Sequence, residues 1–210
     1  MKSAKKIVAR FSGVTRAVAG IFLAVLLLNG CGGGKPSEVP EAALDRYIKA
    51  AQSGDFKTLY EMDYLPQRQI VLIYRAGEEG RQAKLDENFK KSRELYDEAT
   101  TLVGFSSAWA EKFLFIPQMK YTIGGSETRK LGDNPTSKYR EREAAAVEVA
   151  VEYADAATAP KDAQGSIKKV TYEVKLMPLA DIVKGLKTSL DEKAWIVRSI
   201  DVKSGTLEYW

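Results

Sequence analysis

The hydrophobic pattern of this 210-residue chain changes its period at Pro117, and this change constrains the fold more than any other feature. Before Pro117, apolar residues recur every three or four positions, as over 44–51, which is typical of helices packed on one side. After it, apolar and polar residues alternate over 119–123, 147–153 and 170–176, which is typical of strands with one buried face. Helices followed by strands predict an α+β domain, with N-terminal helices packed on one face of an antiparallel sheet.

Several residues predict where these elements begin and end. Pro40 suits the first turn of a helix, where a missing N–H has no cost, and Gly54 suits its end. Asp55 is placed to cap a second helix over 56–62. We expect Pro66 to interrupt the helical pattern that follows.

Other residues predict where the strands lie and where they bend. Gly124 and Gly125 predict a bulge or bend in the first strand. Residues 195–202 predict a further clear strand, and 206–209 a short edge strand. Residues 181–190 are expected to form a helical or looped excursion between strands.

The start of the chain has the layout of a secretory signal. Five basic residues and no acidic ones precede a twelve-residue apolar run over 17–28. The run ends in Leu28-Asn29-Gly30-Cys31, which resembles the lipobox of bacterial lipoproteins. That resemblance implies cleavage between Gly30 and Cys31 and attachment of lipid to Cys31. It divides the chain into a signal peptide (1–30), a lipidated glycine-rich tether (31–39) and one domain (40–210).

Two alternatives to a lipoprotein leader remain. An uncleaved membrane helix would need about 20 apolar residues, which is more than this run provides. An ordinary secreted protein would carry Cys31 as a free thiol, which is a liability in an oxidising compartment.

The lipobox resemblance also implies a location. Acyl chains, palmitate among them, would hold the protein on a membrane outside the cytoplasm without crossing it. Gly32 stands where an aspartate retains lipoproteins on the inner membrane, so the periplasmic face of the outer membrane is implied if the host has two membranes. In a host with one membrane, the outer face of the plasma membrane is implied.

Composition excludes several classes of function. The chain carries 32 basic and 28 acidic residues, but five of the basic ones lie in the leader. A balanced domain lacks the surplus of Lys and Arg that nucleic-acid binding needs. The chain has no histidine, which removes the commonest general base and the commonest zinc ligand. We therefore expect no nucleic-acid partner, no metal, no cofactor and no assigned catalytic residue.

Both ends of the domain resemble nuclear-transport-factor-2-like domains. The stretch 43–56 has the helix of that family, ending in the Gly54-Asp55 step, and 172–176 with 194–197 resembles its closing strands. The resemblance implies a curved sheet wrapped around the helices to leave a conical pocket, in which members of the family bind ligands or partners or act as enzymes. Residues 66–117 depart from the family pattern, and their fold is not predicted.

Candidate site residues follow from that cone. Seven aromatic residues are expected either to line an apolar cavity with polar handles or to pack as core: Tyr47, Tyr60, Tyr64, Trp109, Phe113, Tyr172 and Trp195. Acid–base chemistry would fall to side chains near the first helices, for which helix caps and surface positions are the simpler interpretation: Asp45, Asp55, Asp63 and Tyr64.

The sequence therefore predicts a membrane-anchored envelope lipoprotein with a non-catalytic binding domain. The ligand would be a small apolar or amphiphilic molecule in a cavity, or an envelope protein on the open sheet face. The alternative is an enzyme that uses a buried carboxylate or tyrosine in a conical pocket. A closed cavity, an exposed docking surface and a buried acid of perturbed pKa, respectively, would distinguish them.

Overall fold

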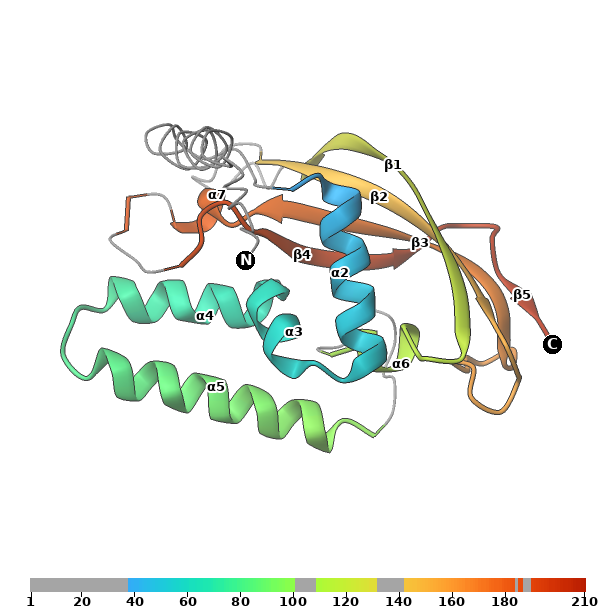
Figure 1. Ribbon diagram of the computed structural model, residues 1–210, viewed down its shortest axis with the longest axis horizontal. Coiled ribbons are helices and arrows are strands. Elements are labelled where there is room, and N and C mark those ends of the chain that lie inside the picture. The colour runs from blue at the N-terminus through green and yellow to red at the C-terminus, as the bar shows by residue number, and fades with distance from the viewer. Residues whose placement is uncertain (1–37, 101–108, 132–141, 184, 187–189) are drawn as a thin grey trace, which may run out of the picture. The chain divides into compact units, whose positions relative to one another are not determined.

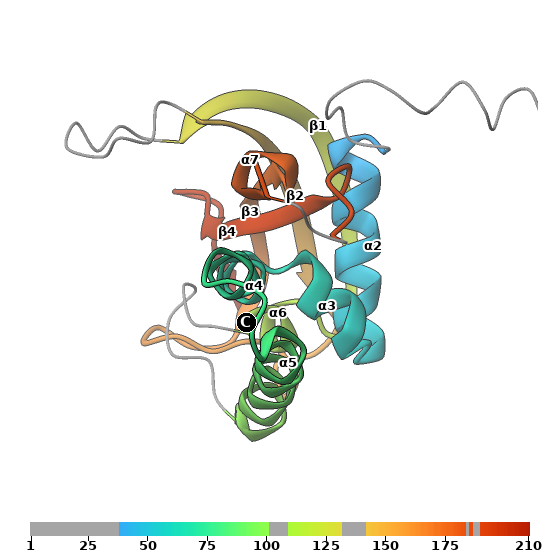
Figure 2. The ribbon, with the colours of Figure 1, turned by 90° about the vertical axis from the view of Figure 1, so that its left-hand side faces the viewer.

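The helices of the first half of the chain pack on one face of a sheet formed by the second half (Figure 1). The structure, a computed structural model, describes residues 38–100, 109–131, 142–183, 185–186 and 190–210. The sheet is antiparallel, curved and not closed into a barrel, and the helices lie inside its curve (Figure 2). The predicted α+β class, with helices before strands on one face of the sheet, is confirmed.

Six described helices belong to the domain. Their bounds are α2 Pro40–Ser53, α3 Phe56–Met62, α4 Tyr64–Arg75, α5 Arg81–Glu98, α6 Glu111–Leu114 and α7 Ala180–Val183. Five described strands follow or flank them. Their bounds are β1 Met119–Leu131, β2 Arg142–Tyr153, β3 Ile167–Pro178, β4 Trp195–Val202 and β5 Glu208–Tyr209. The strands are ordered β1-β2-β3-β4, and β5 pairs with the part of β3 that β4 leaves open.

The predicted limits of the first two helices are confirmed. Pro40 stands at the first position of α2, and Gly54 ends it in the left-handed region at φ 68°. Asp55 then caps α3, because its carboxylate accepts the backbone N–H of Thr58 at 3.2 Å. Left-handed backbone favours glycine because it has no Cβ, so the Gly54-Asp55 step ends one helix and begins the next.

The expectation that Pro66 interrupts a helix is wrong. Asp63 caps α4 by accepting the N–H of Leu65 at 2.8 Å, which places Pro66 within the first turn. The first four N–H groups of a helix have no partner inside it. A proline at that position therefore removes a donor that the helix does not use.

Helix α5 is largely exposed to solvent. It begins after Gly80, which is left-handed at φ 62°, and it buries only Ser92 and Tyr96. Two of its apolar residues, Phe89 and Leu95, are 41% and 59% exposed. The helix packs on α3 and α4 rather than on the sheet.

The predicted irregularity in the first strand is confirmed. The register of β1 with β2 shifts between Ile123 and Ser126, across the two glycines. Beside this bulge, Glu41 of α2 accepts the N–H of Ser126 at 2.7 Å. Further along β1, the Tyr121 hydroxyl donates to Asp45 of α2 at 2.8 Å, so α2 is bonded to the strand at two points.

The core lies between the helices and the inner face of the sheet. It combines the buried faces of α2, α3 and α6 with inward residues of β2, β3 and β4. A smaller apolar cluster packs α4 and α7 against the ends of β3 and β4, around Val71, Met177 and Ile196. All described residues fall within one compact unit that spans 34–210.

Candidate functional site

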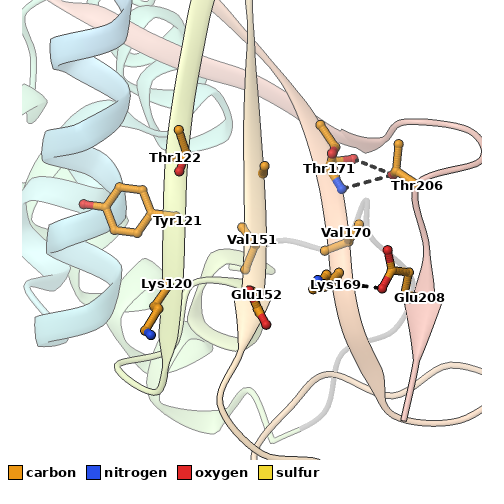
Figure 3. A pocket seen from close by; sticks show the side chains of 11 residues that line it. Lys120, Tyr121, Thr122, Val151, Glu152, Lys169, Val170, Thr171, Thr206 and Glu208 are labelled. Atoms are coloured by element: carbon orange, nitrogen blue, oxygen red, sulfur yellow. Dashed lines mark hydrogen bonds and ion pairs between the residues drawn. The ribbon is translucent and has the colours of Figure 1, made fainter.

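The outer face of the sheet, opposite the helices, carries a solvent-open hollow of about 390 Å³ across β1, β2, β3 and β5 (Figure 3). We call this hollow the outer trough. Its floor and walls follow from the strand register, because cross-strand neighbours on one face of a sheet lie side by side. Two parallel rows of side chains account for its shape.

The first row is charged and alternates in sign. Lys120 of β1 pairs in register with Glu152 of β2, which pairs with Lys169 of β3. Lys169 in turn pairs with Glu208 of β5, and their charged groups lie 4.0 Å apart. Four strands thus present the sequence plus, minus, plus, minus along one edge of the trough (Figure 3).

The side chains of the second row are short and uncharged. Thr122, Ala150 and Thr171 are cross-strand neighbours on β1, β2 and β3. Thr206 extends the row, since its hydroxyl accepts the N–H of Thr171 at 3.0 Å. Small side chains between longer ones leave a depression, so this row forms the floor.

A third row borders the floor on its other side. Glu148 of β2 pairs with Glu173 of β3, which pairs with Asp201 of β4. Lys203 bonds to Glu148, and Lys175 lies 3.0 Å from Asp201. The outer trough itself is therefore lined by the first charged row and by a floor of hydroxyl and methyl groups, and the third row lies beside this lining.

A second open hollow, of about 350 Å³, lies where α6 meets the loop after β2. Lys112 and Phe113 contribute to its lining, together with Pro160. The Lys112 ammonium donates to the carbonyls of Tyr96 at 2.7 Å and Ala99 at 3.0 Å. Those carbonyls end α5, so Lys112 has a structural role as its C-terminal cap.

The inner face of the sheet is filled by aromatic side chains. The Tyr47 and Tyr172 rings both pack edge-on against Phe115, with ring centres 6.4 and 5.9 Å from it. A second group joins α3, α5 and the residues just before α6, because the ring centre of Phe56 lies 5.3 Å from the ring centres of both Tyr96 and Trp109.

The seven predicted aromatic residues do not gather in one place. Five of them are buried in the core: Tyr47, Tyr60, Trp109, Tyr172 and Trp195. Tyr64 is partly buried, and the guanidinium carbon of Arg198 lies 4.2 Å from the centre of its ring. Phe113 borders the second hollow. None of the seven lines the outer trough.

A buried acidic pair lies where the helices meet. Glu111, at the start of α6, is only 2% exposed, and its Oε1 has no hydrogen-bond partner among the described residues. Its carboxyl group is hydrogen-bonded to the Tyr47 hydroxyl, and the negative charge of Asp63 acts on it electrostatically. Asp63, at the α3–α4 junction, is partly buried.

Burial shifts the protonation of both acids. Loss of hydration, with the Asp63 charge as the next cause, raises the pKa of Glu111 to about 8. Burial raises the pKa of Asp63 to about 6, against the opposing effect of the Leu65 N–H. A charged form without water or a counter-ion is disfavoured, so burial favours the neutral form of Glu111.

The other acidic candidates have simpler roles. Asp55 is the helix cap that the sequence predicts, and hydrogen bonds from Thr58 lower its pKa. Asp45 bonds Lys49 and Tyr121 on the surface, and the Lys49 bond is the main cause that lowers its pKa. Neither residue belongs to the buried pair.

Several predicted features lie outside the described residues. These are Gly30 and Cys31, the signal peptide and most of the tether. Within the residues that are described, no helix is both long and apolar enough to cross a bilayer. The same residues contain no group of three or more potential metal ligands.

Sequence reasoning missed Glu111 and the outer trough. One signal for Glu111 is an acid within the apolar stretch 109–116. The trough has no local signal, because its rows depend on the register of strands far apart in the chain.

Comparisons with protein-family models, with curated proteins and with solved structures found no match.

Proposed function

We propose that this protein is a lipid-anchored envelope protein whose domain binds a partner protein along the outer trough without catalysis. The carrying observation is the contrast between the two faces of the sheet. The inner face is filled by Tyr47, Phe115 and Tyr172, whereas the outer trough is open and bounded by charges of both signs. A small apolar ligand would have to displace those rings, so the contrast favours a partner on the open face.

The lining of the trough indicates the chemistry of that partner. Lys120 and Glu152 offer opposite charges, and the floor offers the hydroxyl of Thr122. An extended polar segment with both charge signs could pair with these groups while its backbone faces the floor. Complementary charges at such a surface favour specificity and rapid association more than tight binding.

The binding surface can be tested without disturbing the core. A photo-crosslinking amino acid at Thr122, on the exposed floor, should give a discrete adduct in intact envelopes. The same group at Glu94, on the exposed surface of α5, should not give that adduct. Ala150→Arg fills the trough and should abolish the Thr122 adduct, whereas Ala157→Arg, at an exposed alanine outside it, should leave the adduct unchanged.

The proposal fails if Thr122 gives no adduct, or if the adduct survives Ala150→Arg. The anchor needs its own measurement, because binding and anchoring are separate properties. Natively produced protein should begin at Cys31 and carry the added mass of acyl chains. A mass that includes residues 1–30, or an unmodified thiol, contradicts the anchor.

A further inference from the structure

The meeting point of α2, α3, α4 and α6 contains a carboxyl group that the binding surface does not use. We propose that Asp63 and Glu111 hold a proton inside the domain at neutral pH, and that its loss loosens the junction of α3, α4 and α6. The two carboxyl groups therefore act as a buried site of protonation. The inference does not depend on the proposed function.

The geometry of Glu111 carries the first step. Its side chain is almost fully buried, and one carboxyl oxygen has no hydrogen-bond partner among the described residues. The carboxyl group is hydrogen-bonded to the backbone N–H of Glu111 and to the Tyr47 hydroxyl, which is neutral because burial raises the pKa of Tyr47. A carboxylate in such a place would lose its hydration without gaining a counter-ion, which is costly. A neutral carboxylic acid has no charge to desolvate and avoids this cost.

The charged groups around the pair do not replace that counter-ion. On α6, the Lys112 ammonium is bound by backbone carbonyls at the end of α5. On α5, Arg93 pairs with Asp97 at 2.8 Å. On β4, Arg198 lies over the Tyr64 ring. Among the described residues, no lysine or arginine forms an ion pair with Asp63 or Glu111.

The remaining titratable groups make ionisation harder. Tyr96 of α5 faces Glu111, and the Glu111 charge raises the pKa of Tyr96 after burial itself. From the α3–α4 junction, Asp63 adds a second negative charge. When like charges share a buried site, the second proton is retained, and the raised pKa of Glu111 agrees with this.

The backbone at this point explains why the proton matters to the fold. Asp63 ends α3, caps α4 and forms a parallel bridge to Val197 of β4. Two residues before Glu111, Trp109 is left-handed at φ 63° while buried against Phe56. Left-handed backbone is unfavourable for a residue that has a Cβ, so packing must hold α6 in place. Two negative charges at this junction would repel each other, and opening it would relieve the repulsion.

The protonation state can be measured directly on the full chain. In detergent, with ¹³C-labelled glutamate side chains, one carboxyl resonance should titrate several pH units above the ordinary Glu midpoint of 4.5. Glu111→Gln should remove that resonance, and the matched exposed variant Glu94→Gln should keep it. The inference is overturned if every glutamate titrates near or below the ordinary midpoint. This measurement on the unmodified chain decides the matter even if a variant fails to fold.

Denaturation between pH 5 and 9 tests the effect on folding. A group with a raised pKa in the folded state stabilises most below its unfolded pKa, and that stabilisation is lost as pH rises toward its folded pKa. The folding equilibrium constant of the unmodified chain should fall by up to about tenfold per pH unit from roughly pH 5 to 8. Glu111→Gln should remove this fall above about pH 6, where Asp63 no longer contributes to it, and Glu94→Gln should retain it. Equal pH dependence in all three chains would contradict the inference.

Amide hydrogen exchange locates the loosening. At pH 9, the amides of α6 and of the α3–α4 junction should exchange at least tenfold faster in the unmodified chain than in Glu111→Gln. Amides in the centre of β3 should not differ locally between the two. Equal exchange at the junction would show that the proton does not control it.

Discussion

The hydroxyl groups of Tyr153 on β2 and Tyr172 on β3 lie 2.8 Å apart in the middle of the core. Tyr153 also donates to the carbonyl of Leu114 at 2.9 Å, which links the sheet to the end of α6. A hydroxyl has one hydrogen and a carbonyl can only accept. Tyr172 is therefore the donor of the pair, and the hydrogen bonds run in one direction from β3 through β2 to α6. Burial is the main cause that raises the pKa of both tyrosines, which keeps both hydroxyls protonated.

This direction predicts unequal effects of two matched substitutions. Tyr153→Phe removes both hydrogen bonds and leaves the Leu114 carbonyl without that donor, so it should cost about 1–3 kcal/mol. Tyr172→Phe removes one donor and leaves the Tyr153 bond to Leu114 in place, so it should cost about 0.5–1.5 kcal/mol. Urea denaturation of both single variants and the double variant would measure the difference. A larger loss for Tyr172→Phe would reverse the assigned direction.

Trp195 should be one of the most sensitive positions of the sheet. Its side chain is 9% exposed, and its indole N–H donates to the Glu38 carbonyl at 2.9 Å. Trp195→Ala should cost about 3–5 kcal/mol. Trp210, which is 53% exposed, is the control, and Trp210→Ala should cost about 0.5 kcal/mol. Similar melting curves for the two variants would place Trp195 outside the core.

The cap of α3 predicts a pH-dependent penalty. Asp55→Ala removes the acceptor for the N–H and the hydroxyl of Thr58 and should cost about 0.5–2 kcal/mol at pH 7. Because these bonds lower the pKa of Asp55 below 3.8, their contribution is present above that value and is lost as the pH falls through the folded pKa. The gap between the two chains in chemical denaturation should therefore narrow below about pH 4. Asp55→Asn keeps an acceptor and should lose less at pH 7, and a gap that widens in acid would contradict the cap.

The helix end at Gly54 should tolerate a side chain poorly for reasons of backbone strain alone. A Cβ added there meets no atom within 4 Å, but the residue is left-handed at φ 68°. Gly54→Ala should therefore cost about 1–2 kcal/mol. Gly125→Ala is the control, since it also meets nothing within 4 Å and lacks that conformation. Equal thermal stabilities of the two variants would show that strain at Gly54 is not the cause.

Asp63→Asn should change the titration of Glu111 in a defined direction. Asparagine keeps a side-chain oxygen for the Leu65 N–H but carries no charge, so the pKa of Glu111 should fall below about 8. It should stay above 4.5, because burial is the larger cause of the shift. Carboxyl NMR of the labelled variant measures both limits. An unchanged midpoint would show that the two acids do not interact.

The parts of the fold that sequence could predict are those set by neighbouring residues. Asp55 caps α3 through a residue three positions later, and β4 begins at Trp195, where the predicted strand 195–202 begins. Pro66 was misjudged because the cap that starts α4 lies before it, at Asp63. Spacing alone does not distinguish a proline in the first turn from one inside a helix.

The candidate site was less predictable, because it depends on contacts between distant segments. Thr122, Ala150 and Thr171 form one floor only after three strands take their register. Glu111 resembles any other acid in a charged chain until the fold buries it. Aromatic residues were predicted as lining or core, and no local pattern distinguishes these roles, because both place rings on the inner face.

The bond between Glu41 and the Ser126 N–H has a consequence for how copies of this chain behave together. In the described part of the sheet, β1 pairs only with β2, so its other side offers backbone donors and acceptors. Unused strand edges invite the addition of another chain and the growth of fibres. The Glu41 carboxylate accepts one of these donors, the Ser126 N–H at the bulge. Helix α2 therefore opposes the addition of another strand at this edge, in addition to packing on the core.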